Sequence, residues 1–489
     1  MNGSPRGGSF PSEFAHCQEK FGLARLSEGC YSAARMSETP GQLVPFREAL
    51  RLWVEVGLNS FGGPAGQIAV MHRLVVEERR WVSEARFLHA LNYCMLLPGP
   101  EAQQLATYLG WLLHGYRGGL AAGVLFVLPG FVAILALTLL YVWFRDVRAV
   151  EVLLFGLKAG VLAVVLEAVI RIGRRVAGGP ATFGLAAAAF VALFFFGVPF
   201  PLVVLGAGVF GLVLPHALPA RAPAGDDEPQ RLIDALLERR STHLQPSLAR
   251  AARVAGVCLV LWLGPLAALW LARGPDDVFT QIGVFFSKTA VVTFGGAYAV
   301  LAYIAQQASA TYGWLTPAEM LDGLGMAETT PGPLIQVVQF VGFLAAYRNP
   351  GTLSPLGAGI WAAVLTTWVT YVPCFLFVFV GAPWIEALRG NARLASALAA
   401  ITAAVVGVIL NLALWFGLHV LFGELRTLPG PLGAQLTAPV WSTFQWVPAA
   451  IAVGAFLALV RFHRGMITTL AAAAALGAVY RLLAAQAAP

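Results

Sequence analysis

The sequence has little charge for its length. Of its 489 residues, 12% are charged and 58% are hydrophobic, and the mean hydropathy is +0.73. A soluble globular protein contains about twice this share of charged residues, so the chain has too little polar surface to cover a molecule in water. The scarcity of charge excludes secreted, cytosolic and disordered proteins and predicts an integral membrane protein.

Cysteine is scarce and scattered. The five cysteines are Cys17, Cys30, Cys94, Cys258 and Cys374. No two of them have the close spacing that a zinc site or a redox dithiol requires. We therefore expect no metal site, no disulfide framework and no cofactor. Serine–histidine and zinc-protease motifs are also absent, which argues against an enzyme.

A basic stripe interleaved with aromatic residues is absent too, so the formal net charge of +7 does not predict a nucleic-acid partner. Cytoplasmic loops of membrane proteins are rich in Lys and Arg, and we interpret the surplus as a topology signal. The first 45 residues contain no apolar stretch like the core of a signal peptide, so we expect none there. We expect residues 1–45 to be a polar cytoplasmic tail, with Met36 as an alternative start.

Long uncharged runs follow. A membrane-spanning helix needs about 20 apolar residues, so each run has room for one or two spans; the runs are 118–144, 176–220, 254–272 and 349–385. A polar stretch over 221–253 separates two hydrophobic halves and is the natural linker. It contains the Asp226–Asp227 pair, which we interpret as solvated charge.

The two halves repeat each other. Phe61–Gly62–Gly63 recurs as Phe294–Gly295–Gly296, 233 residues later. The same offset relates Trp81 to Trp314, Pro98–Gly99–Pro100 to Pro331–Gly332–Pro333, and Gln103 to Gln336. Further along the offset becomes 244, which relates Pro129 to Pro373 and Glu167 to Asn411. Four landmarks in one register indicate a duplicated unit.

The first part of each unit contains helical pieces that are too short to span a membrane; in the first half they are 46–60, 65–76, 84–97 and 101–116. Each has about 14 residues, or about 21 Å, against a hydrocarbon core of about 30 Å. Two arrangements fit: helices broken near the membrane midplane, or re-entrant hairpins with the glycine turns at their tips. Spanning pieces would place Arg79 and Arg80 outside, against the positive-inside bias. The charges therefore favour hairpins.

About four full spans follow in the first half, near 119–143, 150–170, 181–197 and 200–216. One extra helix, 254–272, then turns the chain over, so the halves should be inverted. We predict an all-α integral membrane protein with two inverted homologous repeats. Its parts are the tail 1–45, repeat 1 over 46–216, the linker and linking helix over 217–277, and repeat 2 over 278–489. Inverted repeats with interrupted helices are typical of transporters.

The interrupted helices suggest an anion site. Glycine permits a tight turn, and proline is tolerated where a helix begins. Free N–H groups at such starts, each end with roughly +0.5 charge, would converge on a small tetrahedral dianion. Neighbouring residues with neutral donors would complete the site: Asn59, Ser60, Gln103, Gln104 and Thr107, and Thr293, Thr329, Thr330, Gln336 and Gln339. The alternative is that the turns only kink or pack helices.

A few charges lie within apolar segments, where charge is costly and functional by default. We predict that Lys288, the repeat equivalent of Glu55, attracts the anion. Glu101 and Glu328 lie beside the Pro-Gly-Pro turns and are candidate proton carriers, Glu101 before Glu328, with simple helix capping as the alternative. Lys158 and Glu167 need other partners. We interpret His72, His89, His114 and His216 as structural or interfacial.

Three segments closely resemble the signature segments of the chromate ion transporter family. They are 59–64 (NSFGGP), 98–119 (PGPEAQQLATYLGWLLHGYRGG) and 329–343 (TTPGPLIQVVQFVGF). The likeness covers both halves, as in the long two-domain members. The family motifs fall on Asn59, Phe61, Gly62, Gly63, Pro64, Pro98, Gly99, Pro100, Glu101, Gln103 and Gln104, and more loosely on Phe294, Gly295, Gly296, Pro331, Gly332 and Pro333. Ala297 stands where Pro64 stands in the first half, so the site should be asymmetric.

The resemblance implies a protein of the bacterial cell inner membrane that exports chromate, driven by the membrane potential or by protons. Sulfate would compete, because it shares the charge and shape of chromate. We predict export by alternating access, with chromate, sulfate and membrane lipid as partners and homodimerisation left open. The rivals are a carrier that takes up sulfate or another oxyanion, an anion channel and, third, a membrane enzyme.

Overall fold

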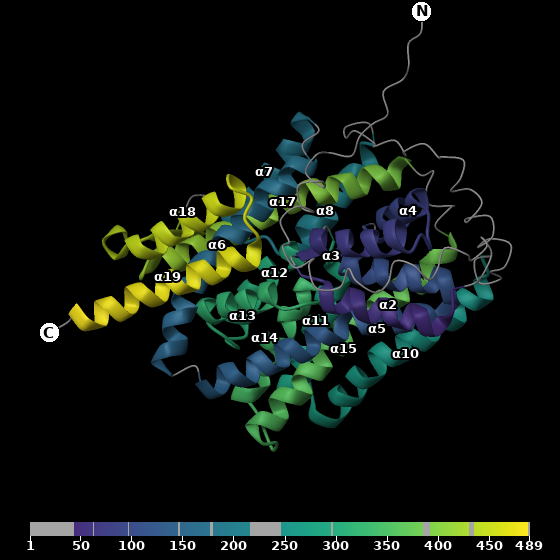
Figure 1. Cartoon of the computed structure of the whole chain (residues 1–489), viewed down its shortest axis with the longest axis horizontal. Coiled ribbons are helices and arrows are strands. Elements are labelled where there is room, and N and C mark those ends of the chain that lie inside the picture. The colour runs from purple at the N-terminus through teal and green to yellow at the C-terminus, as the bar shows by residue number, and fades with distance from the viewer. Residues whose placement is uncertain are drawn as a thin grey trace, which may run out of the picture.

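The computed structural model describes residues 44–61, 63–95, 97–144, 147–176, 179–215, 246–294, 297–384, 392–429 and 435–487. In these ranges the fold is almost entirely helical (Figure 1). The sheet that they contain is one antiparallel pair of strands, β1 (Leu425–Pro429) and β2 (Gln435–Pro439), which the sequence did not predict. The predicted all-α membrane architecture is confirmed.

Six described helices are long and apolar enough to cross a membrane. They are α5 (Glu101–Phe144), α6 (Arg148–Val176), α10 (Leu248–Arg273), α15 (Pro355–Gly381), α17 (Ala392–Leu421) and α19 (Met466–Ala487). The extra helix predicted between the halves is α10. Shorter apolar helices are α7 (Pro180–Phe194), α8 (Phe200–Val213), α11 (Val278–Val292), α14 (Val337–Arg348) and α18 (Trp446–Val460).

Helix α5 consists of two helical arms joined by a sharp turn. His114 and Gly115 leave the helical conformation, and Gly115 has a φ of +61°. Gly110 before the turn and Gly118 after it pack so closely that a methyl group on either would clash with the backbone of the other. Because neither has a side chain, the two arms can lie directly against each other.

In the first half, the short helices fold back on themselves. Helix α2 (Phe46–Asn59) precedes α3 (Gly63–His72), a π-helical turn η1 (Arg73–Glu78) and α4 (Glu84–Cys94). Arg79 follows η1, yet it lies 3.4 Å from Glu48 in the first turn of α2 and 3.4 Å from Glu55. The end of α3 and η1 therefore returns to the start of α2, as in the hairpin arrangement.

The second half has the equivalent pieces α12 (Ala297–Gln306), η3 (Gln307–Thr311) and α13 (Pro317–Thr329), followed by a 3₁₀ turn η4 (Leu334–Gln336) and α14. A capping box of Thr316 and Glu319 starts α13. Arg348, at the end of α14, donates to the Trp314 carbonyl at 2.7 Å and to Glu319 at 2.6 Å. The end of α14 therefore lies beside the start of α13, so this pair is also a hairpin.

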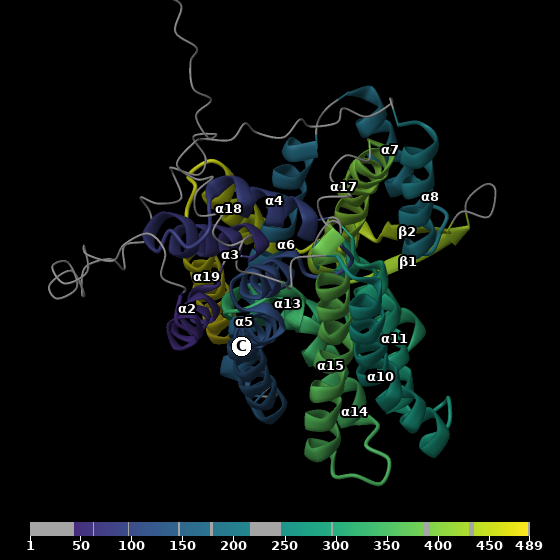
Figure 2. The same ribbon diagram turned by 90° about the vertical axis from the view of Figure 1, so that its right-hand side faces the viewer.

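The later helices of each half pack against helices of the other half. Helix α6 of the first half packs along α18 and α19 of the second, and α17 of the second half packs along α7 and α8 of the first. Both groups are visible in two perpendicular views (Figures 1 and 2). Each half is therefore needed to bury the helices of the other.

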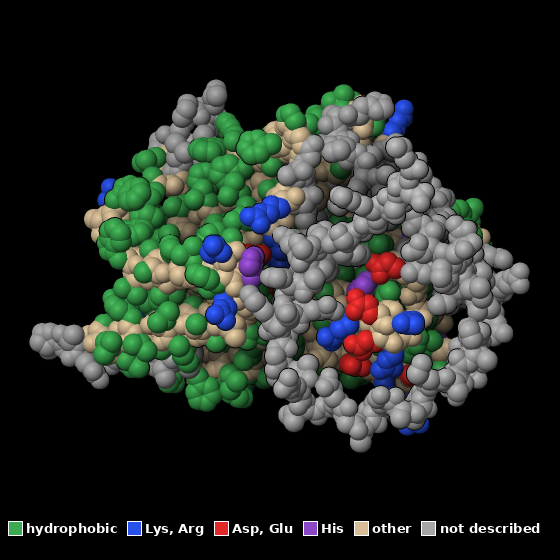
Figure 3. Space-filling model, turned by 45° about the horizontal axis from the view of Figure 1, so that its top comes forward, with side chains coloured by type: hydrophobic (Ala, Val, Ile, Leu, Met, Phe, Trp, Pro, Cys, Tyr) green, Lys and Arg blue, Asp and Glu red, His purple; other side chains and the backbone are tan. Residues whose placement is uncertain are grey.

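Large apolar side chains cover much of the outside. On α5 the exposed Leu120, Val124, Leu128 and Val132 recur every four residues and form one helix face. Apolar side chains dominate much of the visible face in Figure 3, and charged side chains gather in a limited part of it. Such a surface is typical of helices that face lipid.

Candidate functional site

The glycine turns adopt backbone conformations that require glycine. Gly63 has a φ of +70°, Gly99 of +128° and Gly332 of +95°. These values lie in the left-handed region, where a side chain is strained. The predicted site residues Gly62, Gly295 and Gly296 lie outside the described residues.

The turns of one half contact the turns of the other. The N–H of Gly99 donates to the Thr293 carbonyl at 2.7 Å, and the N–H of Gly332 donates to the Ser60 carbonyl at 2.9 Å. The 233-residue offset relates Gly99 to Gly332 and Ser60 to Thr293. The same hydrogen bond is thus made twice, once in each direction between the halves.

Helices α5 and α15 back the two Pro-Gly-Pro turns. A methyl group on Gly332 would lie 3.1 Å from the Gly130 backbone, and one on Gly99 would lie 2.8 Å from Cys374 Sγ. Gly130 and Cys374 are themselves related by the 244-residue offset. Gln67 on α3 donates to the Gly332 carbonyl at 2.6 Å, so α3 is tied to the second turn as well.

The prolines stand at or beside helix starts. Pro64 is the second residue of α3, whereas Pro100 immediately precedes α5 and Pro333 precedes η4. Pro98 begins the first Pro-Gly-Pro turn, and its carbonyl accepts from Gln104 at 2.7 Å. In the second half the carbonyl of Pro331 lies against Gly130. Phe61 is half-buried at its turn.

The predicted hydroxyl groups are directed at their own helices. Ser60 donates to Val56, Thr293 to Thr289 and Thr330 to Ala327, while Thr329 donates to Gly325 and Met326. Asn59 is exposed and donates to the Glu55 carbonyl. In this conformation these groups bond to carbonyls at helix ends, so the hydroxyl hydrogens are not offered to an anion.

The buried glutamines are partly satisfied. Gln103 donates to Thr107 at 3.0 Å, Gln336 to Gln339 at 2.5 Å and to Thr367 at 3.1 Å, and Gln339 to the Phe131 carbonyl at 3.1 Å. The side-chain oxygens of Gln103, Gln104 and Gln336 have no hydrogen-bond partner in the described part of the chain. Buried amides with unused capacity are costly and are suited to a polar solute or water.

The three charged residues predicted for the site differ in how deeply they are buried. Lys288 is exposed on α11, on one face with the exposed Val284 and Val291. Glu101 is the half-buried first residue of α5. Glu328 is only 2% exposed and accepts from the Tyr298 hydroxyl at 2.6 Å. Of the three, Glu328 is therefore the most completely enclosed.

Sequence reasoning missed Asp322. This carboxylate on α13 is 2% exposed; Lys158 lies 3.3 Å from one of its oxygens, and Tyr141 donates to the same oxygen at 3.2 Å. Asp322 is thus the partner that Lys158 lacked. The signal was a lone aspartate in the weakly polar segment 317–329, but nothing in the sequence connects it to α6.

Glu167 has its partner on its own helix. Arg171, one turn later, lies 3.5 Å from it, and Arg171 also contacts Tyr298 and lies near Glu328. Lys158, Glu167 and Arg171 on α6 therefore face Asp322 and Glu328 on α13.

One polar corner lies outside the apolar segments, between η1 and α4. His72 lies 2.5 Å from Glu84 and 3.1 Å from Glu77. The hydrogen bond to Glu84 raises the pKa of His72, and the charges of Glu84 and Glu77 add to the effect, while partial burial opposes it. The corner is thus held by a histidine that favours its charged form.

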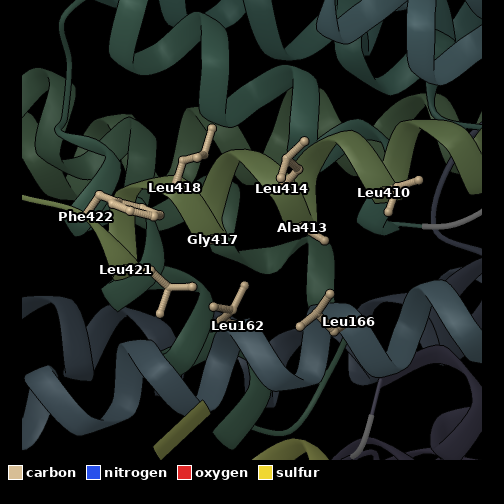
Figure 4. Close-up of a pocket in the computed structure, with 9 residues that line it drawn as sticks. All are labelled: Leu162, Leu166, Leu410, Ala413, Leu414, Gly417, Leu418, Leu421 and Phe422. Carbon is tan, nitrogen blue, oxygen red and sulfur yellow. The ribbon is translucent and has the colours of Figure 1, made fainter. Parts of the chain in front are cut away.

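A pocket of about 260 Å³ lies between α6 and α17 (Figure 4). All of its lining residues are apolar: Leu162, Leu166, Leu410, Ala413, Leu414, Gly417, Leu418, Leu421 and Phe422. A dianion would lose its hydration there without replacement. The pocket is therefore not the anion site.

The model of the chromate transporter family matches residues 47–212 and 280–478. A chromate transport protein of Pseudomonas aeruginosa is 32% identical over 398 residues, which cover 79% of this chain and 86% of that protein. The chain belongs to the chromate transporter family. It is accordingly a transport protein and not an enzyme, and its apolar helices make it a multi-pass bacterial membrane protein.

Two further relatives agree with this assignment. A chromate transport protein of Cupriavidus metallidurans is 24% identical and covers 85% of this chain and 93% of its own length. A probable chromate transport protein of Synechococcus elongatus is 25% identical and covers 74% and 82%. No solved structure matches the chain.

Proposed function

We propose that this protein exports chromate from the cytoplasm by alternating access, with sulfate as a competing substrate. Its membership of the chromate transporter family supports chromate as the substrate. The observation that supports the mechanism best is the exchange of hydrogen bonds between the two halves, from Gly99 to Thr293 and from Gly332 to Ser60. Equivalent turns that hold each other can separate and re-form, as rocking of one repeat against the other requires.

The two halves act as inverted repeats in this proposal. Arg250 at the start of α10 lies near Tyr116, beside the turn in α5, and His114 of that turn contacts Val44. Helix α10 has 26 residues, or about 39 Å, and a four-residue link over 274–277 joins it to α11. The first end of α10 thus lies beside the start of the first half, and its other end leads into the second half. In this proposal the two halves therefore begin on opposite sides of the membrane.

The substrate binds where the turns meet. The first N–H groups of α3 and α5 have no intrahelical partner and attract an oxyanion through their positive ends. The amides of Gly99 and Gly332 are already bonded to carbonyls, so the neighbouring N–H groups of each helix start serve as donors. Gln103, Gln104 and Gln339 each donate one side-chain N–H within the protein, and their second N–H groups add neutral donors.

A carboxyl group beside the turns carries the coupling proton. Glu101 and Glu328 are the candidates. Glu328 is favoured because it is only 2% exposed, and an ionised carboxylate there would repel a dianion unless it took up a proton. Glu101→Gln should leave the pH dependence of transport unchanged, and Glu328→Gln should remove it. A Glu101→Gln variant that loses its pH dependence would instead assign the coupling to Glu101.

Transport is tested with purified protein in vesicles. We expect saturable uptake of labelled chromate that excess sulfate inhibits and that an imposed membrane potential drives. Failure to move chromate while sulfate is moved would replace the proposal with a sulfate carrier. Large ohmic single-channel currents would replace it with an anion channel.

A further inference from the structure

Arg171 lies at the centre of a group of polar side chains from three helices. It is 29% exposed on α6 and lies 3.5 Å from Glu167 on the same helix. On its other side it contacts Tyr298 of α12, which donates to Glu328 of α13 at 2.6 Å. Helix α13 packs against both α6 and α12 (Figure 1).

This group borders the glycine turns. A methyl group on Gly63 would lie 3.8 Å from the Tyr298 hydroxyl, and Glu328 is the third residue before Pro331. Gln67, one turn into α3, is bonded to the Gly332 carbonyl. Arg171 therefore stands one side chain away from the start of α3 and from the second Pro-Gly-Pro segment.

The charges of this group do not balance. Glu167 and Glu328 are two carboxylates that face one guanidinium, and Glu328 Oε2 is buried without a hydrogen-bond partner among the described residues. An enclosed excess of negative charge is costly. A proton on Glu328 removes this excess and leaves Arg171 with Glu167 as its single carboxylate partner.

We propose that Arg171 recognises the oxyanion, its guanidinium moving from Glu167 to the tetrahedral dianion at the Gly63 turn. A guanidinium matches two oxygens of such an anion at once. Lys158 is engaged by Asp322, which also accepts from Tyr141, and Lys288 is exposed on α11. The inference rests on the proposed function, because it names the residue that reads the substrate.

Protonation of Glu328 and binding of the dianion then favour each other, and the linkage is reciprocal. The groups that face Glu328 are Tyr298 from α12 and Arg171 and Glu167 from α6. Elsewhere on α13, Asp322 meets Lys158 of α6 and Tyr141 of α5, and Glu319 meets Arg348 of α14. In the described part of the chain, α17 and α19 present no charged group to Glu328.

Isothermal titration of the purified full chain with chromate, and separately with sulfate, tests the assignment. Arg171→Gln should weaken binding by about 10- to 100-fold, the worth of a hydrogen bond to a charged group, and Arg171→Lys should weaken it less. Arg174→Gln is the matched control, because it removes the same charge from an exposed position of the same helix. An Arg171→Gln variant within about twofold of the Arg174→Gln control would overturn the proposal.

Glu167→Gln gives a readout that misfolding cannot imitate. Since it removes a competitor for the guanidinium, it should tighten binding by about threefold, and weaker binding would contradict the proposal. Sulfate, which stays a dianion near neutral pH, should bind the unmodified chain more weakly as pH rises, and Glu328→Gln should remove this trend. An unchanged trend in Glu328→Gln would remove the linkage from the proposal.

The outcomes separate this inference from the proposed function. Sulfate binding without chromate binding would overturn the function as chromate export and would still test Arg171. Chromate binding that ignores Arg171 would overturn the inference alone. If the unmodified, folded chain binds neither anion, both are wrong.

Discussion

Gly99 adopts a conformation that other residues reach only under strain. At its φ of +128°, a methyl group would also lie 2.7 Å from Gln104 Nε2 and 2.8 Å from Cys374 Sγ. We expect Gly99→Ala to destabilise the protein by about 1–3 kcal/mol and to lower chromate uptake, because the turn could no longer meet Thr293. Melting temperature in detergent and vesicle uptake measure both effects.

Gly264→Ala is the control for this change. Gly264 lies inside α10 with open space around it, and alanine is the better helix former by about 1 kcal/mol. The control should be neutral or slightly stabilising. Equal melting temperatures and uptake rates for the two variants would contradict the role given to the Gly99 turn.

His72 makes the polar corner sensitive to pH. Its pKa in the folded protein is raised above the ordinary value of 6.5, so the folded state holds the proton more tightly than the unfolded state. The resulting stabilisation is complete below about pH 6.5 and is lost as pH rises through the raised pKa. We expect the melting temperature to fall over this interval, and His72→Gln to reduce the fall.

Glu84→Gln tests the cause of this shift. Glu84 provides the hydrogen bond that raises the pKa most, so its removal should shrink the pH-dependent part of the stability. Glu78→Gln, at an exposed neighbouring position, should leave the pH dependence intact. A pH profile that survives Glu84→Gln would show that His72 owes its proton to other groups.

At the scale of elements, α13 is held to its neighbours by ionic contacts. Removing Asp322 would leave Lys158 without its partner, and breaking a buried pair costs several kcal/mol. Because Lys158 remains partly exposed, we expect Asp322→Asn to cost only about 1–3 kcal/mol. Asp276→Asn, at an exposed position beside α11, is the matched control.

The double variant Asp322→Asn with Lys158→Gln should recover part of the loss, because neither charge is then left unpaired. Melting temperatures of the single and double variants form the cycle. Additive effects would mean that the two residues do not stabilise each other.

The sequence predicted several elements well and one not at all. The pieces 101–116 and 119–143 were expected as separate helices, and the turn at His114 and Gly115 divides α5 at this place. The short apolar helices around the glycine turns were also expected. The β1–β2 hairpin was missed because two five-residue strands have too few residues for a periodic pattern.

At the scale of the molecule, inverted halves predict opposite exposure of equivalent corners. Glu78 and Thr311 are related by the 233-residue offset, and both are exposed. In a cysteine-free background, Glu78→Cys and Thr311→Cys should react with an impermeant maleimide from opposite sides of a sealed membrane. Labelling of both from one side would show that the halves are parallel.

The sequence by itself determined the membrane class, the duplication and the position of the breaks, because these follow from apolar run lengths, repeated motifs and glycine and proline chemistry. It also marked Lys158 and Glu167 as charges in need of partners. Only the tertiary structure decided that Gly99 donates a hydrogen bond to Thr293 and that Asp322 is the ionic partner of Lys158. It likewise placed Lys288 on the exposed face of α11 and Arg171 beside the glycine turns. These pairings join residues far apart in the chain, and they depend on how α6, α12 and α13 pack, which no local pattern specifies.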